Sequence, residues 1–114
     1  MPHYLLQLAY APQAWNAQLK NPQNRVEQVA GLMQRLRGRF ECAYYAFGEY
    51  DIVGIAEFPD NVSAATFSMV ISAGGTAKAA ATTPLLSIDE GLQAMRRGSE
   101  VSTAYSSPQQ VTVE

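Results

Sequence analysis

Residues 40–58 constrain the fold more than any other stretch, because two β-rich runs flank a short polar turn. The first run, 40–47, is rich in aromatic residues, and the second, 52–58, is mostly aliphatic. The turn at 48–51 contains Gly48 and Asp51, residue types that favour tight turns. Two such runs around such a turn predict a β-hairpin.

The pairing within this hairpin follows from the position of the turn. A turn centred on 49–50 places Tyr45 opposite Gly54. It also places Cys42 opposite Glu57. Both faces of the hairpin are then apolar, whereas an antiparallel sheet with one solvated face alternates apolar and polar residues. We therefore expect both faces of this sheet to be covered.

The turn and the aromatic strand before it resemble the signature of the GYD domain family, with Gly48, Tyr50 and Asp51 as the motif. The resemblance extends from about Tyr4 to about Met95. It implies a ferredoxin-like fold that pairs as a dimeric α+β barrel, in a family of small proteins whose functions are poorly characterised. The family supplies no agreed catalytic residues, so the resemblance supports the fold more than the function.

We expect the motif residues Gly48, Tyr50 and Asp51 to form a structural turn. Glycine adopts positive φ without steric cost, so Gly48 is expected to use that conformation. Asp51 is expected to accept hydrogen bonds from amides of the turn.

Hydrophobic periodicity predicts the element order β-α-β-β-α-β, followed by a C-terminal helix. This is the split βαβ, ferredoxin-like pattern of an α+β protein. Before the hairpin we expect a strand at 4–10, a helical turn at 14–19, and a helix opened by Asn21-Pro22 and stopped by Gly38. After the hairpin we expect a helix at 62–73 and a strand at 76–86. The last expected element is a short helix that begins with a capping box at Ser87 and Glu90 and closes at 96–98. Helical spacing places Arg25 on the solvent side of its helix.

The chain divides at residue 98 in this prediction. Residues 1–98 form the GYD-like domain. Residues 99–114 form a polar tail that is either flexible or pairs with a partner chain, for example through an edge strand at 111–113. Because helices cover one face of a ferredoxin-like sheet, a symmetric partner is the simplest cover for the other. We expect a homo-oligomer, at least a dimer, that pairs through its sheet faces.

Composition excludes several classes of protein. The net charge of −2 argues against a nucleic-acid-binding face, which should be basic. No apolar run is long enough to span a membrane, and the N-terminus lacks a signal-peptide pattern. A cytoplasmic location is therefore expected. A single cysteine excludes an intrachain disulfide.

The candidate pocket residues are His3, Tyr10, Cys42, Tyr44 and Glu57. His3 and Cys42 have no partner at metal-ligand spacing, so we expect neither a metal nor a cofactor. Cys42 is either a nucleophile beside His3 or, as we favour, a buried thiol that packs like a small hydrophobe. Glu57 is either an inward-facing general base with a raised pKa or, as we favour, an edge residue that reaches water or an arginine of a partner chain.

Several tyrosines lie on the predicted sheet, and their type fits two roles. Tyrosines can orient a ligand in a pocket through their hydroxyl groups. They are also enriched at protein interfaces. The tyrosines in question are Tyr4, Tyr10, Tyr44 and Tyr45.

The sequence identifies no catalytic residue. We expect a homo-oligomeric protein that binds a small apolar or aromatic molecule. A cofactor-independent enzyme of the oxygenase or isomerase type, with a pocket lined by Tyr, Glu and His, is the alternative suggested by analogy with other dimeric α+β barrels. A ligand-sensing or scaffold module is the third hypothesis.

Overall fold

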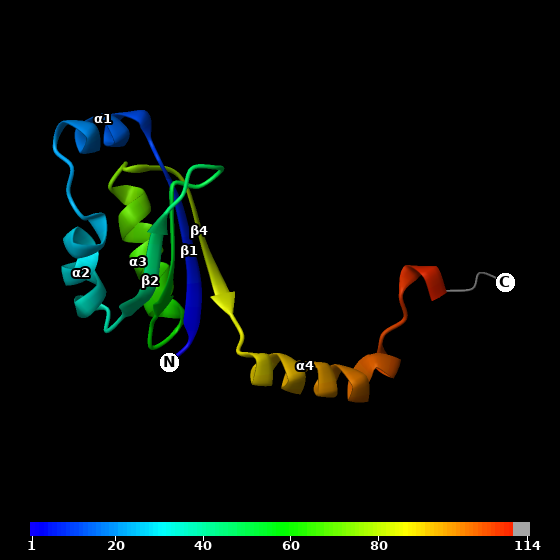
Figure 1. Ribbon diagram of the computed structural model, residues 1–114. Coiled ribbons are helices and arrows are strands. Elements are labelled where there is room, and N and C mark those ends of the chain that lie inside the picture. The colour runs from blue at the N-terminus through cyan, green and yellow to red at the C-terminus, as the bar shows by residue number, and fades with distance from the viewer. Residues whose placement is uncertain (111–114) are drawn as a thin grey trace.

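A four-stranded antiparallel sheet with strand order β2-β3-β1-β4 organises the computed structural model, which describes residues 1–110 (Figure 1). The strands are β1 (His3–Tyr10), β2 (Arg39–Tyr45), β3 (Ile52–Glu57) and β4 (Ala77–Leu85). The helices are α1 (Pro12–Lys20), α2 (Arg25–Arg35), α3 (Asn61–Ala73) and α4 (Ile88–Val101), followed by two short 3-10 turns, η1 (Ser102–Ala104) and η2 (Pro108–Gln110). The predicted ferredoxin-like α+β order is confirmed.

The hydrophobic core lies between the sheet and the helices α2 and α3, which cover the same sheet face (Figure 1). Tyr4 and Phe58 are its largest fully buried side chains. Their rings meet edge to face with centroids 5.7 Å apart, and Phe67 of α3 packs on Phe58 at 5.6 Å. Met33 of α2 and Ala56 of β3 complete the contact between the two layers.

The start of α2 differs from the prediction. Asn21 ends α1 instead of opening the next helix, and α1 is a full helix that starts at Pro12 rather than a single turn. Asn24 caps α2, because its side chain accepts hydrogen bonds from the amides of Val26 and Glu27 at 3.0 and 3.2 Å. Asparagine is a favourable N-cap residue at either position. The prediction that Asn21 opens this helix is therefore wrong, and Asn24 is the N-cap.

The end of α2 also differs from the prediction. The residue in the left-handed conformation is Arg37 (φ 57°), not Gly38. The amide of Gly38 donates to the carbonyl of Met33 at 2.9 Å and closes the turn. Gly38 is needed for a different reason, since a Cβ there would lie 2.7 Å from the Phe58 ring.

The hairpin has a longer loop than predicted. The Ala46 amide donates to the Asp51 carbonyl at 2.8 Å, so residues 47–50 form the loop. Tyr45 pairs with Ile52, and Ala43 takes the place opposite Gly54. The predicted register is therefore wrong by two residues, a shift that keeps the side chains of residues 42–45 on their predicted faces.

The longer loop removes the need for an unusual glycine conformation. Two-residue hairpin turns require positive φ, whereas four-residue loops are mostly built around a type I turn, which does not. Among the described residues, positive φ occurs at Arg37 and Gly75, so the expectation for Gly48 is wrong.

A bulge interrupts β2. Phe40 pairs with Ala56 and Cys42 pairs with Ile55, which leaves Glu41 as the extra residue. The outer strands of the sheet are β2 and β4. β4 contains Lys78 and Pro84 within its length.

The face of the sheet opposite α2 and α3, here called the open face, carries a central apolar area. Leu5 lies beside Ile55 in the register, and Gln7 lies beside Val53. Tyr44 pairs with Val53 and is 66% exposed. The described part of the chain therefore leaves this face uncovered, although its sequence is that of a covered one.

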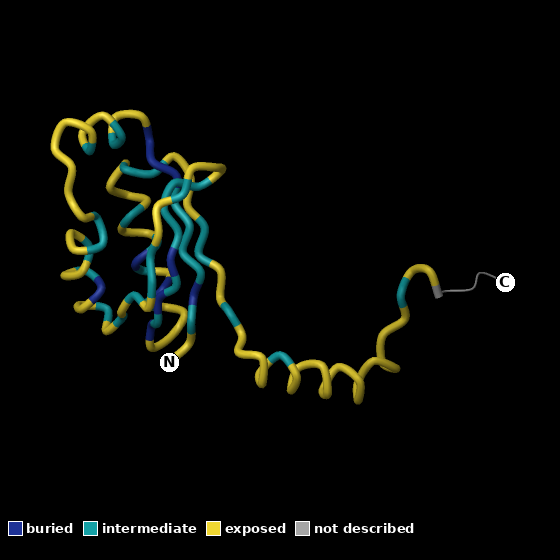
Figure 2. The backbone as a smooth tube through the Cα atoms, viewed as in Figure 1, coloured by how far each residue is buried: buried dark blue, intermediate teal, exposed yellow. Residues whose placement is uncertain are grey.

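Helix α4 projects away from the layer as an arm (Figure 1). Figure 2 shows it exposed along almost its whole length. The radius of gyration is 19.1 Å, against about 13 Å for a compact chain of similar length. No helix within residues 1–110 combines the length and the apolar content needed to cross a membrane.

The capping box that starts α4 is present as predicted, with reciprocal hydrogen bonds between Ser87 and Glu90 of 3.0 Å each. The helix continues past Gly98 to Val101, so its predicted end is wrong. A glycine inside a helix lowers its stability without ending it. The edge strand predicted at 111–113 lies outside the described residues.

Candidate functional site

A cavity of about 90 Å³ lies between the sheet and the helices α2 and α3. Its walls are mostly aliphatic and aromatic, and include Leu6, Val29 and Phe67. The space exists because two small residues, Gly54 and Ala43, pair across β3 and β2 at its floor. A Cβ on Gly54 would lie 2.7 Å from the Cys42 carbonyl oxygen, so a larger residue does not fit there.

One end of the cavity is polar and contains Tyr10, Arg25 and Thr76. A second, more polar cleft of about 270 Å³ shares Arg25 and Thr76 with the cavity. Arg25 therefore lies where the apolar cavity meets the polar cleft. Its Nη1 donates to Gln28 Oε1 at 2.6 Å, which orients the guanidinium along the first turn of α2.

The phenol of Tyr10 is buried, and its ring packs edge to face on Trp15 with centroids 5.2 Å apart. Burial raises the pKa of the phenol, the charges of Tyr45 and Asp51 act in the same direction, and Arg25 opposes them. At neutral pH Tyr10 is therefore a protonated phenol that can donate a hydrogen bond into the cavity.

Asp51 of the GYD motif lies behind Tyr10. Its Oδ2 accepts a hydrogen bond from the Tyr10 amide at 2.8 Å, and its own amide donates to the Leu8 carbonyl at 2.9 Å. The side-chain partner is thus an amide of β1 rather than one of the turn. Gly48 is exposed and a Cβ there would meet no atom within 4 Å, while Tyr50 is partly buried.

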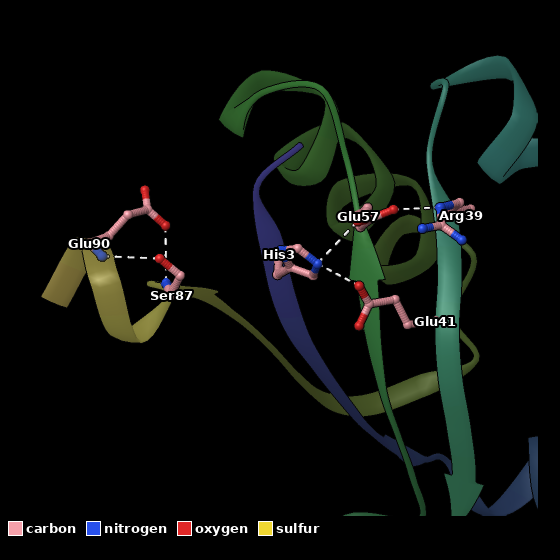
Figure 3. Close-up of polar contacts among 6 residues, drawn as sticks. All are labelled: His3, Arg39, Glu41, Glu57, Ser87 and Glu90. Atoms are coloured by element: carbon pink, nitrogen blue, oxygen red, sulfur yellow. Dashed lines mark hydrogen bonds and ion pairs between the residues drawn. The ribbon is translucent and has the colours of Figure 1, made fainter.

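The candidate residues named from the sequence do not share one pocket. Tyr10 lines the cavity. Cys42 and Tyr44 pair with Ile55 and Val53, which places them on the open face. The remaining two, His3 and Glu57, meet on the same face at one end of the sheet (Figure 3).

Register explains why His3 and Glu57 meet. Glu57 pairs with Arg39 on one side and with His3 on the other, so the three form a row across β2, β3 and β1. Arg39 Nε donates to Glu57 Oε2, and His3 Nε2 lies 3.1 Å from Glu57 Oε1. Glu41, the bulge residue, brings its Oε1 into contact with the same His3 nitrogen (Figure 3).

Arg39 stabilises the charged form of Glu57. Its hydrogen bond holds the pKa of the Glu57 carboxyl below the ordinary value, partly offset by desolvation, and the charge of His3 acts in the same direction as Arg39. This shift is opposite to the rise expected for an inward-facing general base. The arginine comes from the same chain, not from a partner.

Sequence reasoning missed Arg25, Arg39 and Glu41. Helical spacing placed Arg25 on the solvent side, whereas it is the first residue of α2, is partly buried and lines the cavity. Arg39 and Glu41 depend on the β2 register and its bulge, for which the sequence has no local signal.

Comparison with known proteins identifies the family. A family model described as the GYD domain matches residues 4–95. Searches of curated proteins and of solved structures gave no match. The matched range starts in β1 and ends in α4, so the cavity and the hairpin motif lie inside it. The chain therefore belongs to the GYD domain family.

Proposed function

We propose that this GYD domain protein binds a small apolar or aromatic molecule in the cavity between its sheet and its helices. The observation that carries the proposal is an apolar cavity that ends at two polar donors, Tyr10 and Arg25. Small-molecule sites commonly combine apolar walls with a few polar groups that fix orientation. In the described part of the chain, the titratable groups lining this cavity are Tyr10 and Arg25, a set that suits binding.

The two donors favour a ligand with an anionic end. A guanidinium donates hydrogen bonds and cannot accept them, and it pairs most strongly with carboxylates and phosphates. The cavity volume of about 90 Å³ is below the roughly 150 Å³ of an apolar cavity known to hold benzene. The part of the ligand inside the cavity would therefore be at most a single ring or a short aliphatic chain, with its charged end outside, in the polar cleft.

Benzoate and benzyl alcohol form a matched pair of probes, since they share a ring and differ in charge. We expect calorimetric titration to show binding of both, with benzoate the tighter. Arg25→Met should weaken benzoate at least about tenfold, the loss of roughly one charge-assisted hydrogen bond, and leave benzyl alcohol nearly unchanged. Arg35→Met, at the other end of α2, is the control and should change neither affinity.

A second variant tests the cavity itself. Ala43→Leu adds bulk at the cavity floor and should weaken both probes. Binding that survives Ala43→Leu, or a wild-type protein that binds neither probe at millimolar concentration, would exclude this cavity as the site. Circular dichroism of each variant shows whether it has folded.

We also propose that the protein functions as a homodimer in which a second copy covers the open face. The support is an apolar area in which Tyr44 is exposed and Val53 and Ile55 are partly exposed, together with an extended arm. Soluble monomers rarely expose apolar patches larger than a few hundred Å². Burial contributes about 25 cal/mol per Å², so a patch of ordinary interface size exceeds an association cost of at least about 4 kcal/mol.

Sedimentation velocity across a range of concentrations tests the dimer. Ile55→Lys introduces a charge into the centre of the open face and should convert a wild-type dimer into a monomer. Val62→Lys places the same charge on an exposed position of α3 and should leave the dimer intact. A wild-type protein that stays monomeric and folded at high micromolar concentration would contradict the proposal.

A further inference from the structure

Three side-chain atoms of metal-binding type meet at one end of the open face. His3, Glu41 and Glu57 each direct one donor atom to a common point, and these atoms lie within 4.8 Å of one another (Figure 3). The residues come from β1, β2 and β3, so the arrangement depends on the strand register rather than on a local motif. The bulge in β2 supplies Glu41, and bulges commonly redirect a side chain in this way.

The spacing of the donor atoms suits a small cation. Two ligand atoms bound at about 2.0–2.1 Å to a tetrahedral ion lie about 3.3 Å apart. His3 Nε2 and Glu57 Oε1 are 3.1 Å apart, and Glu41 Oε1 contacts the same nitrogen. Small side-chain adjustments therefore bring all three atoms to ligand distance from one ion.

We infer that His3, Glu41 and Glu57 bind one divalent transition-metal ion of the zinc class. Zinc accepts imidazole nitrogen and carboxylate oxygen, whereas magnesium and calcium prefer oxygen ligands alone. Three protein ligands leave at least one coordination position open, as in zinc sites that also bind water or a substrate.

The surroundings of the site support its use by an ion. Glu57 is the most buried member, with a side chain 12% exposed, and Arg39 holds its other oxygen from outside. Such outer partners orient metal-binding carboxylates. His3 and Glu41 are 42% and 34% exposed, which leaves a route for the ion from solvent. Arg39 compensates one carboxylate charge, and an ion would compensate the other.

The competing explanation is an ion-pair cluster in which a protonated His3 bridges two carboxylates. Calorimetric titration of the untagged protein with ZnCl₂ separates the two. We expect saturable binding of one zinc per chain. His3→Ala and Glu41→Gln should each weaken zinc binding at least about tenfold, the lower end of the effect of removing even an outer partner of a metal ligand.

Two controls are matched to these variants. Glu49→Gln removes a carboxylate from the exposed hairpin loop and should leave zinc affinity unchanged. Cys42→Ser removes the thiol on the same sheet face and should also leave zinc affinity unchanged. Glu41 lies in an exposed bulge, so Glu41→Gln should fold even if His3→Ala does not.

A second readout uses cobalt. Co²⁺ bound in place of zinc should give visible absorption bands that Glu41→Gln abolishes and Glu49→Gln retains. The inference is overturned if the wild type shows no saturable zinc binding, or if affinity survives both His3→Ala and Glu41→Gln. Loss of binding in Cys42→Ser equal to that in His3→Ala would overturn it too, because the thiol would then be a ligand.

Discussion

Helices α3 and α4 are similar in length and in the way they begin, yet their surroundings differ completely. Asp60 caps α3 by accepting a hydrogen bond from the Ser63 amide at 2.8 Å, and Ser87 caps α4 through its capping box. Helix α3 buries Ala64 and Phe67 against the sheet. Helix α4 buries no residue, although Ile88, Leu92 and Met95 recur at helical spacing along one side.

The contrast separates two causes of helix formation. Caps mark where a helix begins, and both α3 and α4 have one. Packing decides whether the helix is held in place, since isolated helices of about this length are only marginally stable in water. The layer formed by the sheet with α2 and α3 therefore carries the stability of the fold, and the α4 arm needs a second surface for its apolar side.

The largest expected effect on stability comes from comparing a substitution at the centre of the layer with one in the arm. Phe58→Ala should lower the free energy of unfolding by about 3–5 kcal/mol, because it leaves a cavity beneath two other aromatic rings. Leu92→Ala should change it by less than about 0.5 kcal/mol in the monomer. Urea denaturation measures both. A large effect of Leu92→Ala that grows with protein concentration would show that the arm packs on a second copy.

Two glycines give a second comparison. Gly54→Ala should cost about 1–3 kcal/mol, because the new methyl group meets a backbone carbonyl that cannot move aside. Gly91→Ala in α4 meets no atom within 4 Å and should raise helix content instead, since alanine favours a helix by about 1 kcal/mol over glycine. Thermal unfolding followed by circular dichroism measures both. A destabilised Gly91→Ala variant would mean that the arm is packed.

Asp51 and Ser87 offer a third comparison, between a hydrogen bond within the layer and one in the arm. Asp51→Ala should lower stability by about 1 kcal/mol, because the Tyr10 amide loses its acceptor. Asp51→Asn keeps an acceptor oxygen and should recover most of the loss. Ser87→Ala should reduce helix content without changing the urea midpoint. If Asp51→Ala abolished ligand binding without changing stability, the GYD motif would be part of a binding site rather than a structural turn.

The smallest expected effect is on the pH dependence of stability, through Asp60 at the start of α3. The backbone hydrogen bond from Ser63 lowers the pKa of the Asp60 carboxyl, so Asp60 stabilises the fold above its unfolded pKa of about 3.9. That stabilisation is lost as the pH falls through the lower folded pKa. Asp60→Asn should therefore flatten the decline of the unfolding free energy as the pH falls below about 4.

Glu90→Gln is the matched control in the arm. The hydrogen bond from the Ser87 amide also lowers the pKa of the Glu90 carboxyl. Helix α4 projects away from the layer (Figure 1) and buries no residue. Glu90→Gln should therefore leave the decline of the unfolding free energy at acid pH unchanged. If Asp60→Asn and Glu90→Gln flattened the acid decline of the unfolding free energy equally, the arm would unfold together with the layer.

The elements that the sequence predicted well are those with local signals. The strands alternate or run apolar, and Asp60 and Ser87 mark the starts of their helices. Errors arose where two local signals competed, as at Asn21 and Asn24, or where loop length decided the pairing, as in the hairpin.

The sites were harder to predict because they depend on contacts between strands. The cavity exists because Gly54 faces Ala43, a pairing hidden by an error of two residues in the register. The grouping of His3, Glu41 and Glu57 needs the strand order, the register and a bulge at the same time. Each of these is a property of the folded sheet rather than of any short segment.

The outer strands β2 and β4 have a consequence for how copies of this chain avoid aggregation. Free sheet edges recruit strands from other molecules, and long regular edges promote fibril growth. Pro84 lacks an amide hydrogen, Lys78 adds a charge to the same edge, and the bulge at Glu41 breaks the regularity of the other. Both edges are thus poor templates for strand addition, so a second copy of this chain would have to bind to its faces or its arm.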